Sequence, residues 1–312
     1  MISFKKLLVL CRLGNQMFQY VFLRVTAERL GVKFFCPPWM GDDIFLLNDE
    51  KERVEQAIDI DKTYIEPIWN VGLNEDALGI EDGTEIEGYF QTEKYYPDSE
   101  KVRGWYTFQG EKIAGVEEKY KHIDFSRSVG LHLRFGDIMR SPACYVFYVP
   151  SVDYYVRALS HIRHKENILV FSDEIESAKK HLKKIGRDVI YIEGNKDYED
   201  LHLMSLCHDF ICSGSTFSWW GAWLNSHLDK TIVVPKEGAF RPACPKKNDD
   251  FWPDGWIRES AAVGDCPLWI RFYFRHLRLF KLLLKNFNFL IRIFLKFLNA
   301  IKHETRVRGF EL

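Results

Sequence analysis

Apolar and polar residues along the chain predict an alternation of strands and helices that begins near the N-terminus. The apolar run at residues 4–10 predicts a strand, which a turn connects to a helix over residues 16–30. Gly31 stands where a helix C-cap glycine belongs, and residues 32–36 form the next predicted strand. The apolar residues of the predicted helix recur at helical spacing and are Met17, Val21, Phe22 and Val25. This order predicts a βαβ unit that opens an α/β domain.

The pattern after the predicted second strand is weaker. It indicates a loop and a polar helix around residues 49–58, a strand over residues 85–91, and one or two exposed helices within residues 97–125. Asp59 and Asp61 spell the DxD pair that many metal-dependent sugar transferases use on a nucleotide diphosphate. They lie far from any glycine turn or long strand, so a solvated loop is the simpler interpretation.

A regular alternation returns in the second half of the chain. Strands are predicted at residues 129–133, 168–171, 189–192, 210–212 and 231–234, and helices near residues 151–163, 174–185, 197–207 and 216–226. Strands that alternate with helices in this way form a parallel, doubly wound sheet, and such sheets bind ligands beyond the carboxyl ends of their strands. That rule brings four polar turns to one edge, namely residues 132–137, 172–174, 193–195 and 213–216.

Residues 209–225, DFICSGSTFSWWGAWLN, combine a buried strand, a small-residue turn and a helix. The hydroxyl groups of the turn suit helix capping, and a helix N-terminus offers free N–H groups and the positive end of a dipole to an anion such as phosphate. The residues expected to face the ligand are Ser213, Ser215 and Thr216, and those expected to anchor the helix in the core are Trp219, Trp220 and Trp223.

Charged side chains follow two other predicted strands. An unpaired cation at a buried strand end is costly, so we expect Arg134 in HLRFGD to hold an anion, and a guanidinium can grip a diphosphate with two hydrogen bonds. Asp137 follows in the same turn. His132 is either a core histidine bonded to the next loop, which we favour, or a catalytic group. Asp173 and Glu174 in FSDE either contact a ribose hydroxyl or guanine edge or begin a helix whose dipole suits an acid, and the helix start is the simpler interpretation for Glu174.

Composition and charge limit the number of domains and the partners. The 312 residues, 46% hydrophobic and 28% charged, are typical of a folded protein with two domains, which we assign to residues 1–125 and 126–262. Residues 267–312 carry a charge of +8, whereas residues 1–266 carry −9. Seven cysteines without CxxC spacing favour reduced thiols over a disulfide framework or a zinc site. No apolar run is long enough to predict a membrane-spanning helix.

The basic segment is predicted to form an amphipathic helix over residues 267–304. Its arginines and lysines recur mainly every three, four or seven positions, so they share one face, while Phe, Leu and Ile occupy the rest. Such a helix suits an anionic membrane surface, although docking onto the protein's own body or dimerisation remains an alternative. A nucleic-acid partner is disfavoured because the body is acidic. We therefore expect a cytoplasmic protein that associates peripherally with the inner face of the membrane.

Five motifs together resemble the bacterial-type galactoside α-1,2-fucosyltransferases of glycosyltransferase family 11. They are RLGNQMFQY at 12–20, GYFQTEKYY at 88–96, HLRFGD at 132–137, FSDE at 171–174 and STFSWWGAWLN at 215–225. The resemblance implies an α/β protein of the GT-B fold, with two Rossmann-like domains facing across a cleft, to which the C-terminal basic amphipathic helix is added. It also implies a GDP-L-fucose donor, and an inverting reaction that uses no metal and no cofactor.

The resemblance assigns donor contacts to particular residues. By it, Arg134 binds the diphosphate, and the turn formed by Gly14, Asn15 and Gln16 looks like the one that lines the cleft between donor and acceptor. His132, Ser172, Asp173, Ser213, Ser215 and Thr216 complete the donor-binding residues that we expect.

The implied mechanism places charge stabilisation on Arg134 and on the amides at Ser215 and Thr216, because GDP leaves with growing negative charge. This stabilisation makes a metal unnecessary, and full activity is expected in excess chelator. A carboxylate takes the proton of the attacking hydroxyl, with Asp137 the first candidate and Asp173 the second. Alternatively, Asp137 orients Arg134 through a salt bridge.

Three residues depart from the family pattern. Phe135 stands where a second arginine is usual, Ile138 where tyrosine is usual, and Gly214 where asparagine is usual. Either Arg12 or Arg140 supplies the missing cation, or donor binding is weaker, or the donor differs.

The sequence therefore predicts transfer of L-fucose from GDP-β-L-fucose to the 2-hydroxyl of a galactose residue on a glycan, in surface polysaccharide or O-antigen synthesis. The expected partners are GDP-fucose, a galactose-containing acceptor and an anionic membrane. Two alternatives remain open, namely a related GT-B enzyme with another nucleotide-sugar donor and a catalytically silent glycan-binding scaffold.

Overall fold

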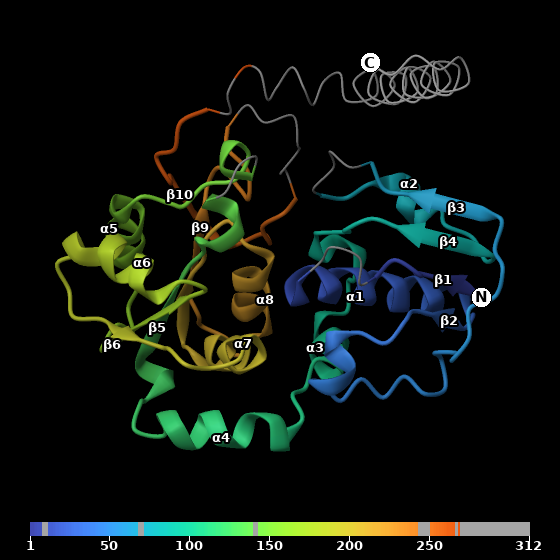
Figure 1. Cartoon of the computed structure of the whole chain (residues 1–312), viewed down its shortest axis with the longest axis horizontal. Coiled ribbons are helices and arrows are strands. Elements are labelled where there is room, and N and C mark those ends of the chain that lie inside the picture. The colour runs from blue at the N-terminus through green and yellow to red at the C-terminus, as the bar shows by residue number, and fades with distance from the viewer. Residues whose placement is uncertain (8–11, 68–71, 140–142, 243–249, 266–267, 269–312) are drawn as a thin grey trace, which may run out of the picture. The chain divides into compact units, whose positions relative to one another are not determined.

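The computed structural model describes residues 1–7, 12–67, 72–139, 143–242, 250–265 and 268. Residues 1–265 form one compact unit, built from two parallel sheets with helices around them (Figure 1). Apart from Leu268, the predicted basic helix at 267–304 lies outside the described residues. None of the described helices is both long and apolar enough to cross a membrane.

The first sheet has parallel strands in the order β2, β1, β4, β3. Their bounds are Ile2–Ser3 for β1, Phe34–Phe35 for β2, Lys62–Ile65 for β3 and Thr84–Glu87 for β4. The first part of the strand predicted at 4–10 is wrong, because residues 5–7 form a turn in which the Lys5 amide donates to the Glu85 side chain, and residues 8–10 lie outside the described residues. The strand predicted at 85–91 ends early, since Phe90 has a φ of 52°.

The polar helix predicted around residues 49–58 is wrong. The Phe34 amide donates to the Glu52 carbonyl at 3.0 Å, and the Val54 amide donates to the Phe34 carbonyl at 2.9 Å. Residues 50–52 form a turn, and Arg53 makes a parallel bridge to Phe34 of β2, so the backbone groups of this stretch find partners outside a helix.

Helix α1, Leu13–Leu30, is buried on nearly every side because it lies between the first sheet and α8, Thr216–Leu224. Gly31 caps it in the left-handed conformation with φ 65°, as predicted. Two helices lie within 97–125, where one or two were expected. We call the first sheet with its helices the first lobe, and the second sheet with its helices the second lobe. The other helices before the second sheet are α2 Glu75–Leu78, α3 Ser99–Trp105 and α4 Gly110–Tyr120, with short 3₁₀ turns at Met40–Asp43, Glu93–Tyr95 and Phe125–Arg127.

The second sheet is parallel throughout, in the order β10, β9, β8, β5, β6, β7. All five predicted strands are present, and β10 adds a sixth that was not predicted. The strands are β5 Ser128–Leu133, β6 Asn167–Ser172, β7 Ile190–Tyr191, β8 Asp209–Ile211, β9 Ile232–Pro235 and β10 Ile257–Glu259. The helices are α5 Val152–His161, α6 Ile175–His181 and α7 Asp197–Leu206, with 3₁₀ turns at Gly136–Met139, Ala143–Tyr145 and Leu182–Lys184.

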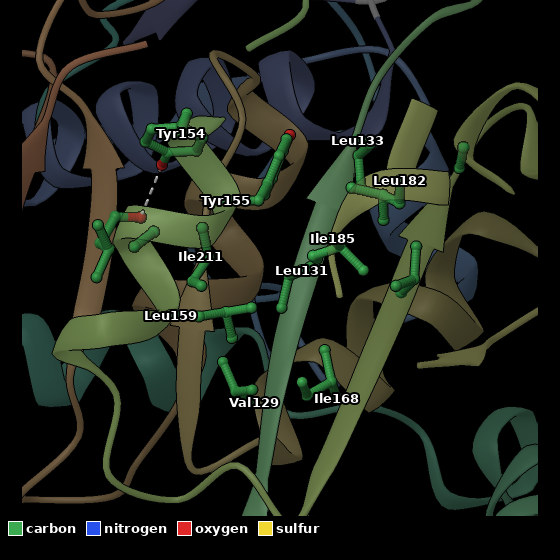
Figure 2. Close-up of a cluster of buried hydrophobic side chains, with 14 of the residues drawn as sticks. Val129, Leu131, Leu133, Tyr154, Tyr155, Leu159, Ile168, Leu182, Ile185 and Ile211 are labelled. Atoms are coloured by element: carbon green, nitrogen blue, oxygen red, sulfur yellow. Dashed lines mark hydrogen bonds between the residues drawn. The ribbon is translucent and has the colours of Figure 1, made fainter. Parts of the chain in front are cut away.

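The core of the second lobe lies between this sheet and α5 and α6. Figure 2 shows Val129, Leu131 and Leu133 of β5 pointing toward Leu159 of α5 and Leu182. The polar ends of two buried tyrosines are satisfied, because the Tyr154 hydroxyl donates to the Cys212 carbonyl at 2.7 Å and that of Tyr155 to the His132 carbonyl at 2.9 Å. These bonds fix the carboxyl ends of β5 and β8.

The indoles of α8 join the two lobes, which confirms their predicted place in the core. Trp219 and Trp220 are fully buried and contact Phe18 of α1, with ring centroids 4.6 and 4.8 Å apart. Trp220 donates through Nε1 to the Gly14 carbonyl at 2.9 Å, and Trp223 to the Glu93 carboxylate at 2.8 Å. Each indole N–H thus has a partner although the rings are buried.

Candidate functional site

A pocket of about 390 Å³ lies at the point where the strand order of the second sheet reverses, between β5 and β8. After β5 the chain continues to strands on one side of the sheet, and after β8 it continues to strands on the other side. The two connections therefore diverge and leave a crevice beyond the carboxyl ends of β5 and β8. The pocket brings together the predicted residues His132, Arg134, Ser172, Asp173, Ser215, Thr216 and, from the first lobe, Gly14. The four polar turns expected at one edge all contribute to it or lie directly behind it.

The N-termini of α1 and α8 meet at this pocket. A side chain on Gly14 would place its Cβ 2.8 Å from the Phe217 nitrogen and 2.9 Å from the Thr216 carbonyl carbon, so only glycine permits this approach. Ser215 caps α8 by accepting from the Phe217 amide at 3.2 Å. The Ser215 amide itself donates to the Ser213 carbonyl at 2.8 Å, which is a correction to the expectation that it faces the leaving group. The first-turn amide of Thr216 has no carbonyl before it within the helix to bond.

Arg134 is held rigidly at the pocket wall. Its Nη2 lies 2.9 and 3.0 Å from the two carboxylate oxygens of Asp137, and its side chain is 22% exposed. Its Nε is buried and has no hydrogen-bond partner among the described residues. Asp137 is not among the residues that line the pocket and acts on it through Arg134.

Arg12 enters the pocket from the first lobe. Its guanidinium lies 3.5 Å from an Asp137 oxygen and 3.6 Å from an Asp173 oxygen. Burial raises the pKa of Asp137, but the hydrogen bond from Arg134 and the charges of Arg134 and Arg12 outweigh burial and leave this pKa below its ordinary value. Two guanidinium groups therefore lie on one side of the pocket. Arg140, the other residue considered as a second cation, lies outside the described residues.

Asp173 positions the loop after β5. Its Oδ1 accepts from the Phe135 amide at 2.8 Å, and a Cβ on Gly136 would come within 2.5 Å of its Oδ2. The Phe135 side chain is buried in the core against His181, at 5.6 Å between ring centroids. The position at which the motif pattern led us to expect a second arginine thus supplies a backbone donor and core packing here.

His132 is a neutral group that supports the pocket. Its Nδ1 lies 2.8 Å from the Ser213 hydroxyl, and both residues are almost completely buried. Burial, followed by the nearby Arg134 guanidinium, lowers the pKa of His132 to about 3. The favoured interpretation as a core histidine bonded to the next loop agrees with this geometry. Gly214 follows Ser213 in the chain, and a Cβ added to it would lie only 3.1 Å from the Ala239 Cα. A larger residue therefore fits poorly at this position.

The far wall of the pocket comes from α7 and the loop before it. Asp200 accepts from the Asn195 amide group at 2.9 Å, and burial raises the pKa of Asp200 to about 7. Asp197 lies beside it on the same wall. The sequence indicated the turn at 193–195 but not these two acids, because acids in the first turn of a helix are usual without any ligand.

Two residues expected to contact the donor, Asn15 and Gln16, lie away from the pocket, as does the DxD pair. Asn15 accepts from the Gln91 side chain at 2.9 Å, and the buried Gln16 accepts from the Met40 amide at 3.3 Å, so both connect parts of the first lobe and neither lines the pocket. Asp59 and Asp61 are exposed on a loop, in agreement with the simpler interpretation of that pair.

Comparison with known proteins places this pocket in a family context. The sequence pattern of Glycosyl transferase family 11 matches residues 6–260. An alpha-1,2-colitosyltransferase from Escherichia coli is 31% identical over 182 residues, which are 56% of this chain and 62% of the relative. The O-antigen biosynthesis glycosyltransferase WbnK from Escherichia coli is 35% identical over 128 residues, 38% of this chain and 42% of the relative. The chain thus spans less than two thirds of each of these relatives.

Among solved structures, the fucosyltransferase NodZ from Bradyrhizobium has a TM-score of 0.46 at 11% identity, over 70% of this chain and 91% of that chain. The two parallel sheets, with a pocket lined from both lobes, are the GT-B arrangement that the motifs implied. Because the family pattern covers residues 6–260, the chain belongs to glycosyl transferase family 11.

Proposed function

We propose that this protein transfers L-fucose, with inversion, from GDP-β-L-fucose to the 2-hydroxyl of a galactose residue during synthesis of a surface polysaccharide such as O-antigen. The observation that supports this most directly is Arg134, fixed by Asp137 at a pocket where two helix N-termini meet. A relative named for O-antigen biosynthesis supports the proposed pathway class.

The geometry suggests how the leaving diphosphate is stabilised. Arg134 and Arg12 lie on one side of the pocket, and Thr216, the first residue of α8, also lines it. Fixed donors of this kind stabilise charge as it develops and need no reorganisation during the reaction. In this scheme the two arginines do what a metal ion does in other transferases, so activity is expected to persist in excess chelator.

A carboxylate is needed for the proton of the attacking galactose hydroxyl. Asp137 and Asp173 remain the candidates, and both already contact arginines. A lowered pKa makes Asp137 a weak base, which favours its alternative role of orienting Arg134. Asp173 lines the pocket and is the candidate better placed for contact with substrate.

The test is replacement of Arg134 by alanine. GDP binding is expected to weaken roughly 10- to 100-fold, the range for loss of charge-assisted hydrogen bonds, and turnover should fall at least as much. Isothermal titration with GDP and a donor-turnover assay measure the two effects. The control is Arg127→Ala, which removes an exposed arginine paired with Glu166 near the opposite end of β5. Equal GDP affinity in both variants would exclude the diphosphate role.

A second candidate is transfer of colitose, which is L-fucose without its 3-hydroxyl. It is favoured by the relative named as a colitosyltransferase. A pocket that hydrogen-bonds a hydroxyl rejects the analogue without it by about 10⁴-fold, whereas an apolar pocket discriminates weakly. Competition between GDP-fucose and GDP-colitose for one galactoside therefore distinguishes the donors. A protein that releases GDP from neither donor would instead be a glycan-binding scaffold.

We further infer a cytoplasmic location with peripheral attachment to the inner face of the membrane. The support is the sequence of residues 267–304 alone, with its single basic face and apolar remainder.

A further inference from the structure

A cluster of histidines and acids lies at the edge of the second sheet opposite the pocket. His208 and Asp209 stand where β8 begins, and His164 lies in the loop that leads into β6. One ligand atom from each of these three residues lies within 4.8 Å of the others. The pocket uses the carboxyl ends of the same sheet, on the order of 20 Å away along a six-residue strand such as β5.

Two nitrogen–oxygen distances within the cluster are close to those between atoms that bind one metal ion. His164 Nδ1 lies 3.4 Å from Asp209 Oδ2, and this buried nitrogen makes no hydrogen bond among the described residues. His208 Nδ1 lies 3.2 Å from Asp209 Oδ1. Ligand atoms that bind zinc tetrahedrally at about 2.0–2.1 Å are separated by roughly 3.4 Å.

The residues behind these three atoms hold them in the required orientation. The Nε2 of His208 lies 3.1 Å from a carboxylate oxygen of Asp229, and its ring stacks on His227. A histidine that binds a metal usually donates its second ring N–H to a carboxylate in this way. The fully buried Asp209 carboxylate accepts from the backbone amides of Thr231, at 2.6 Å, and His164, at 3.2 Å.

We propose that His164, His208 and Asp209 bind a divalent transition metal, with Zn²⁺ the best match to two imidazoles and one carboxylate. The His164 side chain is 34% exposed, so part of the ring faces solvent and an ion has a route to the cluster. The ion would tie the loop between α5 and β6 to the start of β8. Its role is structural, since it lies at the opposite end of the strands from the sugar-nucleotide pocket.

Titration with Co²⁺ tests the site, because tetrahedral Co²⁺ absorbs visible light. Untagged full-length protein, stripped with a chelator and then dialysed, is expected to bind one Co²⁺ per chain with saturable absorption. Zn²⁺ should displace the Co²⁺ and raise the thermal midpoint. His164→Ala should abolish this saturable binding, and Asp229→Asn, which removes the orienting carboxylate, should weaken it about 10- to 100-fold.

The matched control is His161→Ala, an exposed histidine three positions away that pairs with Glu259. It should bind Co²⁺ like the natural protein. The proposal is overturned if the natural protein binds no stoichiometric Co²⁺, or if His164→Ala binds it unchanged. Either result would leave the three residues as a hydrogen-bonded group only. Circular dichroism confirms that each variant is folded, and GDP affinity, governed by the distant pocket, should be the same in all of them.

Discussion

Glu66 is a buried carboxylate of the first lobe whose surroundings oppose its ionisation. Its Oε2 accepts from the amides of Tyr89 at 2.7 Å and Phe90 at 3.0 Å, while its Oε1 is buried without a partner among the described residues. Burial raises the pKa of Glu66 from 4.5 to about 7, although the two amides act in the opposite direction. The folded protein therefore binds a proton here that the unfolded chain releases.

Glu66→Gln is expected to change the pH dependence of stability. The raised pKa stabilises the natural protein below pH 4.5, and this contribution is lost as the pH rises to about 7. Relative to the natural protein, the variant should gain about 1.4 kcal/mol per pH unit across that interval and nothing more above it. Urea unfolding between pH 5 and 8 measures the difference. The exposed Glu118→Gln should track the natural protein, and a pH-independent difference for Glu66→Gln would contradict the assignment.

At the residue scale, the sequence predicted which kinds of side chain form the site. It did not predict which side chains pair with one another. Arg134 was recognised because a cation at a buried strand end needs an anion. Its bond to Asp137 was one of two open alternatives, and the entry of Arg12 from the other lobe depends on tertiary contacts. The histidine and aspartate cluster was missed altogether, since His164 and His208 are 44 positions apart in the sequence.

At the element scale, the long helices and the buried strands were predicted well because their apolar spacing is regular. Helix α1 and strands β5 to β9 all appear. The errors include the polar helix at 49–58 and three short strands, namely the misplaced β1 and the unpredicted β3 and β10, whose positions are set by pairing partners. Such strands are too short to show a period.

Replacing Gly14 by alanine tests the meeting of α1 and α8. The new methyl would overlap the start of α8, as close as 2.8 Å to the Phe217 nitrogen, so the helices must separate at the pocket. Overpacking of this kind costs about 1–3 kcal/mol, and GDP affinity should fall as well. Thermal unfolding and GDP titration provide the two measurements.

Gly115→Ala is the control for this substitution, because Gly115 lies within α4 with open space around it. It should stabilise the protein by roughly 0.5–1 kcal/mol and leave GDP affinity unchanged. If both glycine variants behave alike, the close approach of the two helices has no functional importance.

At the scale of the whole molecule, the acidic residues 1–266 (the body) and the basic residues 267–312 (the tail) predict how the protein partitions between water and lipid vesicles. Deleting residues 268–312 should abolish binding to anionic vesicles, and neutral vesicles should bind neither form well. Replacing both Lys281 and Lys285 by Gln is a milder change that should lower the partition coefficient roughly 30-fold, at about 1 kcal/mol for each charge. Vesicle sedimentation measures the partition. Unchanged binding after deletion would favour docking or dimerisation of the tail.

The aromatic contact between α1 and α8 also restricts how members of this family can be recombined. Trp219 and Trp220 pack on Phe18, and Trp220 donates a hydrogen bond to the Gly14 carbonyl. Side chains of each lobe therefore form part of the other lobe's hydrophobic core. A chimera that exchanges only the second lobe would pack the α8 side chains of one protein against the α1 helix of another. A poor fit between them would expose apolar surface to water. Donor preference is therefore best transplanted with α1 and α8 as a pair, although they come from opposite halves of the chain.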